Sequence, residues 1–178
     1  MLNPRVGTLV AIIIGAMLSR LIPHPPNATS ITAVALFSGA YFADKRLAFA
    51  LPITALFLSD AMLGFYSHME VVYLSFALIV CLGFTLNQRR SVLRIGIAAV
   101  LASIVFFLVT NFGVWAFGGL YPHTVRGLVE CYFLALPFFT HTLIGDLFYT
   151  ALLFGGFALL QNRFPVLRPA LPQPAWRG

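Results

Sequence analysis

Long apolar runs separated by proline, glycine or charged residues dominate this sequence. Of its 178 residues, 60% are hydrophobic and only 9% are charged, and a water-soluble domain could not carry this composition without exposing large apolar patches. A bilayer core of roughly 30 Å needs about 20 apolar residues per helix, so the chain has room for about six spans and no soluble domain. The sequence therefore predicts an all-α integral membrane protein.

The breaking residues divide the chain into six apolar runs. We expect membrane spans at about residues 6–22, 30–43, 47–66, 70–88, 92–118 and 138–161. Two features leave the count open. The second run is short, and residues 127–139 contain Glu130 and Pro137, so they could form an interfacial helix or the start of the last span. We expect one membrane domain, residues 1–162, and a proline-rich cytoplasmic tail, residues 163–178.

The distribution of Lys and Arg tests this topology, because cytoplasmic loops carry an excess of these residues. With six spans, nine of the 11 fall on one side and only Arg20 and Arg126 fall on the other. This bias predicts that both termini are cytoplasmic. The basic residues are scattered between apolar runs, so we expect no nucleic-acid partner. The nine are Arg5, Lys45, Arg46, Arg89, Arg90, Arg94, Arg163, Arg168 and Arg177.

Three ionisable side chains lie inside the predicted spans, and each falls near an outer end. An ionisable group deep in lipid costs at least ~3 kcal/mol, so such groups usually face a protein interior, a partner charge or a water-filled cavity. An α-helix rises about 1.5 Å per residue, so Arg20, Asp60 and Asp146 would each lie within about 10 Å of an outer helix end. One interpretation is an outward-facing polar pocket. The other is an Asp60–Arg20 ion pair that locks two helices, and both could hold.

Other polar and aromatic residues would surround the same pocket. Asn111 and Trp115 share a face at the end of the fifth span, close to Tyr121, although an interfacial aromatic belt with a helix-capping Asn would explain them equally. Prolines stiffen the connection that carries His24 and Asn27, which makes both residues candidate ligand contacts.

The last span carries a polar stripe. Thr142, Asp146 and Tyr149 follow helical spacing on one face. His141 lies about 140° away from Asp146 on the helical wheel, so we do not pair these two residues as a catalytic unit.

One face of the first span presents small residues at four-residue intervals. Gly7, Ala11 and Gly15 would let another helix approach closely, either a partner or a helix of this chain. The two cysteines, Cys81 and Cys131, form no disulfide framework or metal-binding motif. Motifs for nucleotide binding, zinc proteolysis and serine hydrolysis are missing from the sequence, so we expect no enzyme, no cofactor and no metal site.

Four segments resemble the signature blocks of an uncharacterised family of bacterial membrane proteins described as transport proteins. The resemblance spans about residues 18–158. That family is similar in size and topology to the substrate-binding S components of energy-coupling factor (ECF) vitamin transporters. The four segments read RLIPHPPNATSITAVALFSGAYF, LPITALFLSDAMLGFY, VTNFGVWAFGGLYPHT and LPFFTHTLIGDLFYTALLFGG.

This resemblance implies a six-helix bundle that binds a vitamin in an outward-facing pocket and docks a transmembrane coupling subunit through its first helix. The stripe of Gly7, Ala11 and Gly15 is similar to the docking motif of S components, although it differs from their usual pair of alanines.

Among S components, the chain looks most like the solitary cobalamin-binding ones of Gram-negative bacteria, in which a cysteine coordinates cobalt. Neither Cys81 nor Cys131 lies in a matching segment, so that role does not carry over. If the ligand is a corrinoid, His24 is the candidate contact to cobalt or to an amide. Asp60 and Tyr73 sit where the resemblance implies pocket residues.

Two functions from different classes follow. The leading expectation is a substrate-binding protein of the bacterial inner membrane for uptake of a small organic micronutrient, a vitamin such as cobalamin. The alternative is a structural or assembly membrane protein in which Arg20, Asp60 and Asp146 only fix helix packing. An intramembrane hydrolase or transferase using Asp60 or His141 would need a nucleophile that the sequence does not reveal.

Overall fold

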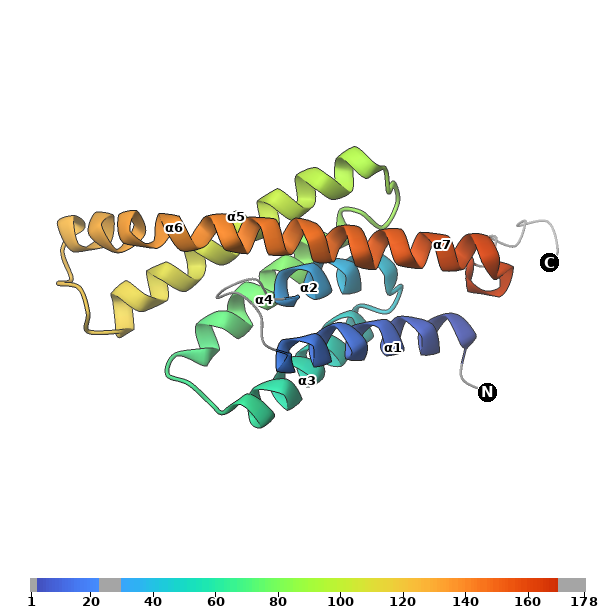
Figure 1. Ribbon diagram of the computed structural model, residues 1–178, viewed down its shortest axis with the longest axis horizontal. Helices are drawn as coiled ribbons and strands as arrows, with labels where there is room; N and C mark the ends of the chain where they lie inside the picture. Colours follow the sequence, from blue (N-terminus) through green and yellow to red (C-terminus); the bar gives the residue numbers. More distant parts are fainter. Residues whose placement is uncertain (1–2, 23–29, 170–178) are drawn as a thin grey trace, which may run out of the picture.

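The computed structural model describes residues 3–22 and 30–169, which form six helical rods joined by short connections (Figure 1). The last rod is continuous from Val125 to Arg163. The elements are α1 (Pro4–Leu18) with the 3-10 turn η1 (Ser19–Leu21), α2 (Ile31–Tyr41), α3 (Lys45–Leu63), α4 (Met69–Phe84), α5 (Val92–Phe117), α6 (Val125–Thr150), the π-helical turn η2 (Ala151–Gly155), α7 (Gly156–Arg163) and the 3-10 turn η3 (Pro165–Leu167).

Short polar side chains set where four of the helices begin. Each accepts a hydrogen bond from a backbone N–H in the first turn, which would otherwise have no partner. These N-caps are Asn3 for α1, Asp44 for α3, Ser91 for α5 and Thr124 for α6.

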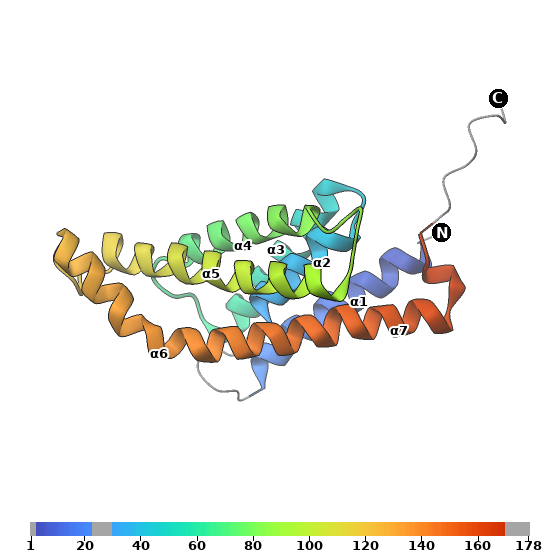
Figure 2. The same cartoon turned by 90° about the horizontal axis from the view of Figure 1, so that it is seen from above.

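The last rod begins 13 residues before the predicted start at residue 138, because the cap at Thr124 starts α6 at Val125. Residues 127–139 therefore belong to this rod and do not form a separate interfacial helix. Pro137 lies inside α6, and an internal proline removes a backbone hydrogen bond and bends a helix. Figure 2 shows such a bend in the first half of α6.

The short helix α2 is the centre of the bundle. All 11 of its residues are buried, and it contacts α1, α3, α4, α5 and α6. Its closest neighbour is α4, because Gly39 of α2 faces Gly83 of α4. A Cβ atom on either glycine would lie 2.9 Å from the Cα atom of the other, so only glycine permits this approach.

Aromatic side chains join α2 to the last rod. Phe37 and Tyr41 of α2 contact the rings of Phe154 and Phe157, with ring centroids 4.7 to 5.8 Å apart. Edge-on and tilted contacts at these separations are the favourable arrangements for aromatic pairs. This cluster ties η2 and α7 to the core.

Four rods are long and apolar enough to cross a membrane, namely Pro4–Leu21, Lys45–Leu63, Val92–Phe117 and Val125–Arg163. Helices α2 and α4 are apolar but shorter. The outer surface of the bundle carries large apolar side chains, such as Leu58 and Phe133, which are 58% and 69% exposed. A surface of this kind suits lipid and not water.

Both ends of the described chain meet at one end of the bundle. Arg5, at the start of α1, donates a hydrogen bond from Nη1 to the carbonyl oxygen of Leu167 at 3.1 Å. Figure 1 shows the start of α1 and the end of α7 on the same side. We call this the Arg5 end, and the opposite end of α1 the Asp60 end. The described start of the proline-rich tail includes the 3-10 turn η3, Pro165–Leu167.

Candidate functional site

Arg20 and Asp60 form a buried ion pair at the Asp60 end. Arg20 lies in η1, directly after α1, and Asp60 lies in the last turn of α3. Nη1 of Arg20 is 2.8 Å from Oδ1 of Asp60, and their side chains are only 8% and 0% exposed. The predicted ion pair between these residues is therefore confirmed.

Neighbouring hydroxyl groups complete this cluster. Tyr73 of α4 donates a hydrogen bond to Oδ2 of Asp60 at 3.0 Å, and Nη1 of Arg20 donates to Oγ of Ser59. Ser59 in turn donates to the carbonyl oxygen of Leu56 at 2.8 Å. Arg20, Ser59, Asp60 and Tyr73, hereafter the Asp60 cluster, thus connect three helices.

The Asp60 cluster retains unused hydrogen-bonding capacity. Nε of Arg20 is buried and has no hydrogen-bond partner among the described residues. Oδ1 of Asp60 contacts Arg20 as an ion pair but without the alignment of a hydrogen bond. A buried guanidinium donor without a partner is costly, so a polar group that reached it would be bound favourably.

Asp146 belongs to a second buried site. Its Oδ2 accepts a hydrogen bond of 2.6 Å from Ser103 of α5, and Thr32 of α2 provides a second side-chain hydrogen bond. These two hydroxyl partners escaped the sequence analysis. Ser103 is an isolated polar residue in the apolar run of α5, which was the available signal.

The prediction that Asp146 lies within about 10 Å of the outer end of its helix is wrong. The residue lies 21 positions after Val125, so about 30 Å of helix precedes it, because α6 begins well before residue 138. Its partner Thr32, however, is in the first turn of α2. The first half of α6 and the end of α5 therefore extend past α2 as a projecting hairpin, which Figure 1 shows on the left.

The residues predicted at the end of the fifth span lie in this projecting hairpin. Asn111 donates to the carbonyl oxygen of Phe107 at 2.8 Å, and Trp115 donates from Nε1 to the carbonyl oxygen of Pro122 at 3.1 Å. Tyr121 lies in the α5–α6 connection and is partly exposed. The hydrogen bond of Asn111 thus stays within α5, and that of Trp115 joins α5 to the α5–α6 connection. Neither residue joins the Asp60 cluster.

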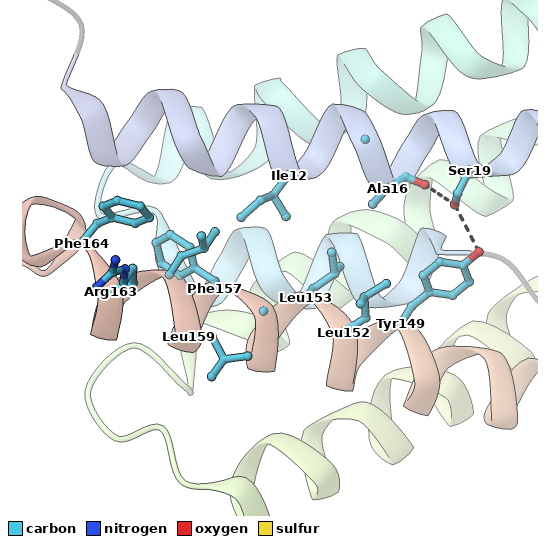
Figure 3. Close-up of a pocket in the computed structure, with 13 residues that line it drawn as sticks. Ile12, Ala16, Ser19, Tyr149, Leu152, Leu153, Phe157, Leu159, Arg163 and Phe164 are labelled. Atoms are coloured by element: carbon cyan, nitrogen blue, oxygen red, sulfur yellow. Dashed lines mark hydrogen bonds between the residues drawn. The ribbon is translucent and has the colours of Figure 1, made fainter.

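The small residues of α1 point away from the core. Gly7, Ala11 and Gly15 are all exposed, and a Cβ atom on either glycine would meet nothing within 4 Å. Within the described part of the chain, no helix therefore packs against the two glycines of this stripe. Gly15 lines an apolar groove of about 670 Å³ between α1 and the last rod. Figure 3 shows the groove, with Tyr149 and Ser19 closing one end and Arg163 at the other.

Two predicted contacts, His24 and Asn27, lie outside the described residues. Within residues 3–22 and 30–169, no three His, Cys, Asp or Glu side chains come together as metal ligands. Cys81 is exposed and Cys131 is buried, with its thiol directed to the carbonyl oxygen of Asn111.

Apolar rods with outward-facing apolar side chains, around a few buried charged groups that have partners inside the bundle, are the features of a helical integral membrane protein. The chain belongs to a family of unknown function (DUF6580), whose model matches residues 1–169. Neither the curated proteins nor the solved structures include a match to this chain.

Proposed function

We propose that this protein is a membrane-embedded binding protein for the uptake of a small organic micronutrient, such as a vitamin. The observation that carries the proposal is the Asp60 cluster, in which a buried guanidinium keeps an unused donor. Charged groups inside a membrane protein usually mark the path or the binding site of a solute. The resemblance to S components supports the same function.

The proposed location is the bacterial inner membrane, with six spans and both termini in the cytoplasm. Nine of the 11 Lys and Arg residues support this orientation. Under it, the Asp60 end faces the periplasm, and the Asp60 cluster lies within one turn of the ends of α1 and α3. A solute would therefore arrive from the outer side.

A solute with both hydrogen-bond donors and acceptors suits this cluster. Asp60 is an acceptor, Tyr73 can donate or accept, and Nε of Arg20 is a free donor among the described residues. Binding would exchange the internal contacts of Asp60 for contacts with the solute, and so loosen the link between α1 and α3. The solute would thereby favour one arrangement of these helices over another.

A transmembrane coupling subunit is a further part of this proposal. The exposed face of Gly7, Ala11 and Gly15 allows close approach of a partner helix, since none of the described residues covers the two glycines. We assign no catalytic role to the protein.

The ion pair itself favours a second candidate, a structural membrane protein in which Arg20 and Asp60 only hold α1 and α3 together. Buried pairs of this kind can fix helix packing without any ligand. Under this alternative the protein binds no small molecule.

Native mass spectrometry of the detergent-purified protein, titrated with a panel of vitamins that includes cobalamin, tests the proposal. We expect one vitamin to bind with one-to-one stoichiometry and Asp60→Asn to abolish its binding. Glu70→Gln is the matched control, because it also replaces a carboxylate by an amide, but at a side chain that is 68% exposed. A folded protein that ignores the whole panel would support the structural alternative, and binding that survives Asp60→Asn would remove Asp60 from the site.

A further inference from the structure

A cavity near the Arg5 end, distinct from the Asp60 cluster, has the dimensions of a ligand site. Its volume is about 720 Å³, within the range of roughly 300–1,000 Å³ that is usual for small-molecule sites. It lies between the α4–α5 connection and the last rod, on the face of that rod opposite the groove of Figure 3. Gly155 lines the cavity, whereas the next residue, Gly156, lines the groove.

One arginine at this cavity and a second beside it have no acidic partner among the described residues. Arg90 lines it, and Arg5 and Arg90 together line an adjoining cavity of about 470 Å³. Both side chains border this adjoining cavity, and like charges so placed repel each other. The ion pairs within the described residues are Arg20–Asp60 and His68–Glu70, so neither Arg5 nor Arg90 is neutralised by an acid there.

The surroundings hold these cations in position. The guanidinium of Arg90 lies 4.3 Å from the ring centroid of Tyr41 and donates to the carbonyl oxygens of Leu86 and Asn87. Arg5 is fixed by its hydrogen bond to Leu167. Two cations held next to each other at the edge of an apolar bundle favour an oxyanion, which would remove their repulsion and accept charge-assisted hydrogen bonds.

A buried hydroxyl group is a second indication of a ligand, independent of the two arginines. Thr150 lines the cavity and is only 4% exposed, and its Oγ1 has no hydrogen-bond partner among the described residues. Thr150 directly precedes η2, and π-helical turns inside α-helices occur frequently at functional sites. The remaining wall is largely apolar and includes Ile95, Ala151 and Phe154.

We propose that this cavity binds a phosphate group carried on an apolar body. The phosphate would contact Arg90 and Arg5, and the apolar part would lie along η2 with a polar atom near Thr150. An anionic phospholipid and a soluble organic phosphate share this chemistry. The site is independent of the micronutrient site proposed above, because the two use different helix ends and different residues.

The test measures binding to the full chain in detergent by native mass spectrometry. The probes are phosphatidylglycerol, phosphatidylcholine as the zwitterionic control, and glycerol 3-phosphate as the soluble phosphate. Gly155→Leu fills the cavity, because a Cβ atom there meets nothing within 4 Å, and Arg90→Gln removes one cation. Gly156→Leu is the matched control, since its Cβ atom is equally unobstructed but its side chain would enter the groove.

We expect one anionic probe to bind the wild type and the Gly156→Leu variant equally. Its affinity should fall about tenfold or more in Arg90→Gln and in Gly155→Leu, as expected for a lost charge-assisted contact or a filled site. Selective retention of phosphatidylglycerol over phosphatidylcholine would identify a lipid site, and binding of glycerol 3-phosphate would identify a soluble ligand. Binding of neither anionic probe, or binding that Gly155→Leu and Arg90→Gln leave unchanged, would overturn the proposal.

Discussion

The hydroxyl group of Ser103 and the carboxylate of Asp146 are joined by a hydrogen bond of 2.6 Å between α5 and the last rod. Both residues are buried, at 0% and 2% exposure. A buried carboxylate that loses a hydrogen-bond donor is left partly unpaired, which costs more than the bond itself contributes. This pair therefore fixes how the two arms of the projecting hairpin are anchored in the bundle.

Replacing Ser103 should accordingly destabilise the protein. We expect Ser103→Ala to lower the free energy of unfolding by about 1–3 kcal/mol, because Asp146 loses a donor while remaining buried. Ser75→Ala is the control, since Ser75 is also buried but donates only to the carbonyl oxygen of Val71 in its own helix. Thermal unfolding in detergent would compare the variants, and equal midpoints for the two would contradict this role of Ser103.

The ion pair of Arg20 and Asp60 allows a double-mutant test. Removing one partner of a buried pair leaves an uncompensated charge and typically costs about 3–5 kcal/mol, so Arg20→Met and Asp60→Leu should each destabilise the fold strongly. The double variant should be milder than the sum of the two, because no charge is left unpaired. Strictly additive losses in unfolding midpoint would argue against a coupled pair.

The glycine contact between α2 and α4 predicts a sharp steric effect. Gly83→Ala would place a Cβ atom 2.9 Å from the Cα atom of Gly39, so we expect loss of most folded protein. Gly96→Ala in α5 is the matched control, because its Cβ atom would meet nothing within 4 Å and alanine favours helix. The yield of monodisperse protein on size-exclusion chromatography measures both, and normal yield of Gly83→Ala would refute the close contact.

The proposed orientation can be tested by cysteine labelling in intact cells. In a background lacking Cys81 and Cys131, His123→Cys in the α5–α6 connection should react with a membrane-impermeant maleimide. Gln88→Cys in the α4–α5 connection should react only after lysis. Both residues are exposed in the structure, so a difference between them reports the side of the membrane. Labelling of Gln88→Cys in intact cells would reverse the proposed topology.

The sequence was sufficient to predict the helical class and the partner of Asp60. An acidic and a basic residue near the ends of two apolar runs have few ways to avoid lipid, so the pairing of Arg20 with Asp60 was one of the two interpretations that the sequence offered, beside a polar pocket. Their positions in the sequence also predicted that Arg20 lies at the end of the first helix and Asp60 at the end of the third.

The environment of Asp146 could not be obtained in the same way. Glu130 and Pro137 are residues typical of the boundary of a span, but α6 begins after its N-cap at Thr124 and continues through both. Asp146 therefore lies far from the start of its helix. Its partners Thr32 and Ser103 come from two other helices, so only the packing reveals them. Arg90 was interpreted as a topology signal, and nothing in the sequence indicates that it lies against Tyr41 beside Arg5.

The shortness of α2 has a consequence for how the protein is made. Its 11 residues span about 17 Å, little more than half of a hydrocarbon core of roughly 30 Å. As a separate segment it would leave backbone and flanking polar groups in lipid, so we expect it to insert only together with its neighbours. Helices α4 and α5 are synthesised later than α2, and they supply part of the wall around it. We therefore expect α2 to remain incompletely inserted in the bilayer until the second half of the chain has been synthesised.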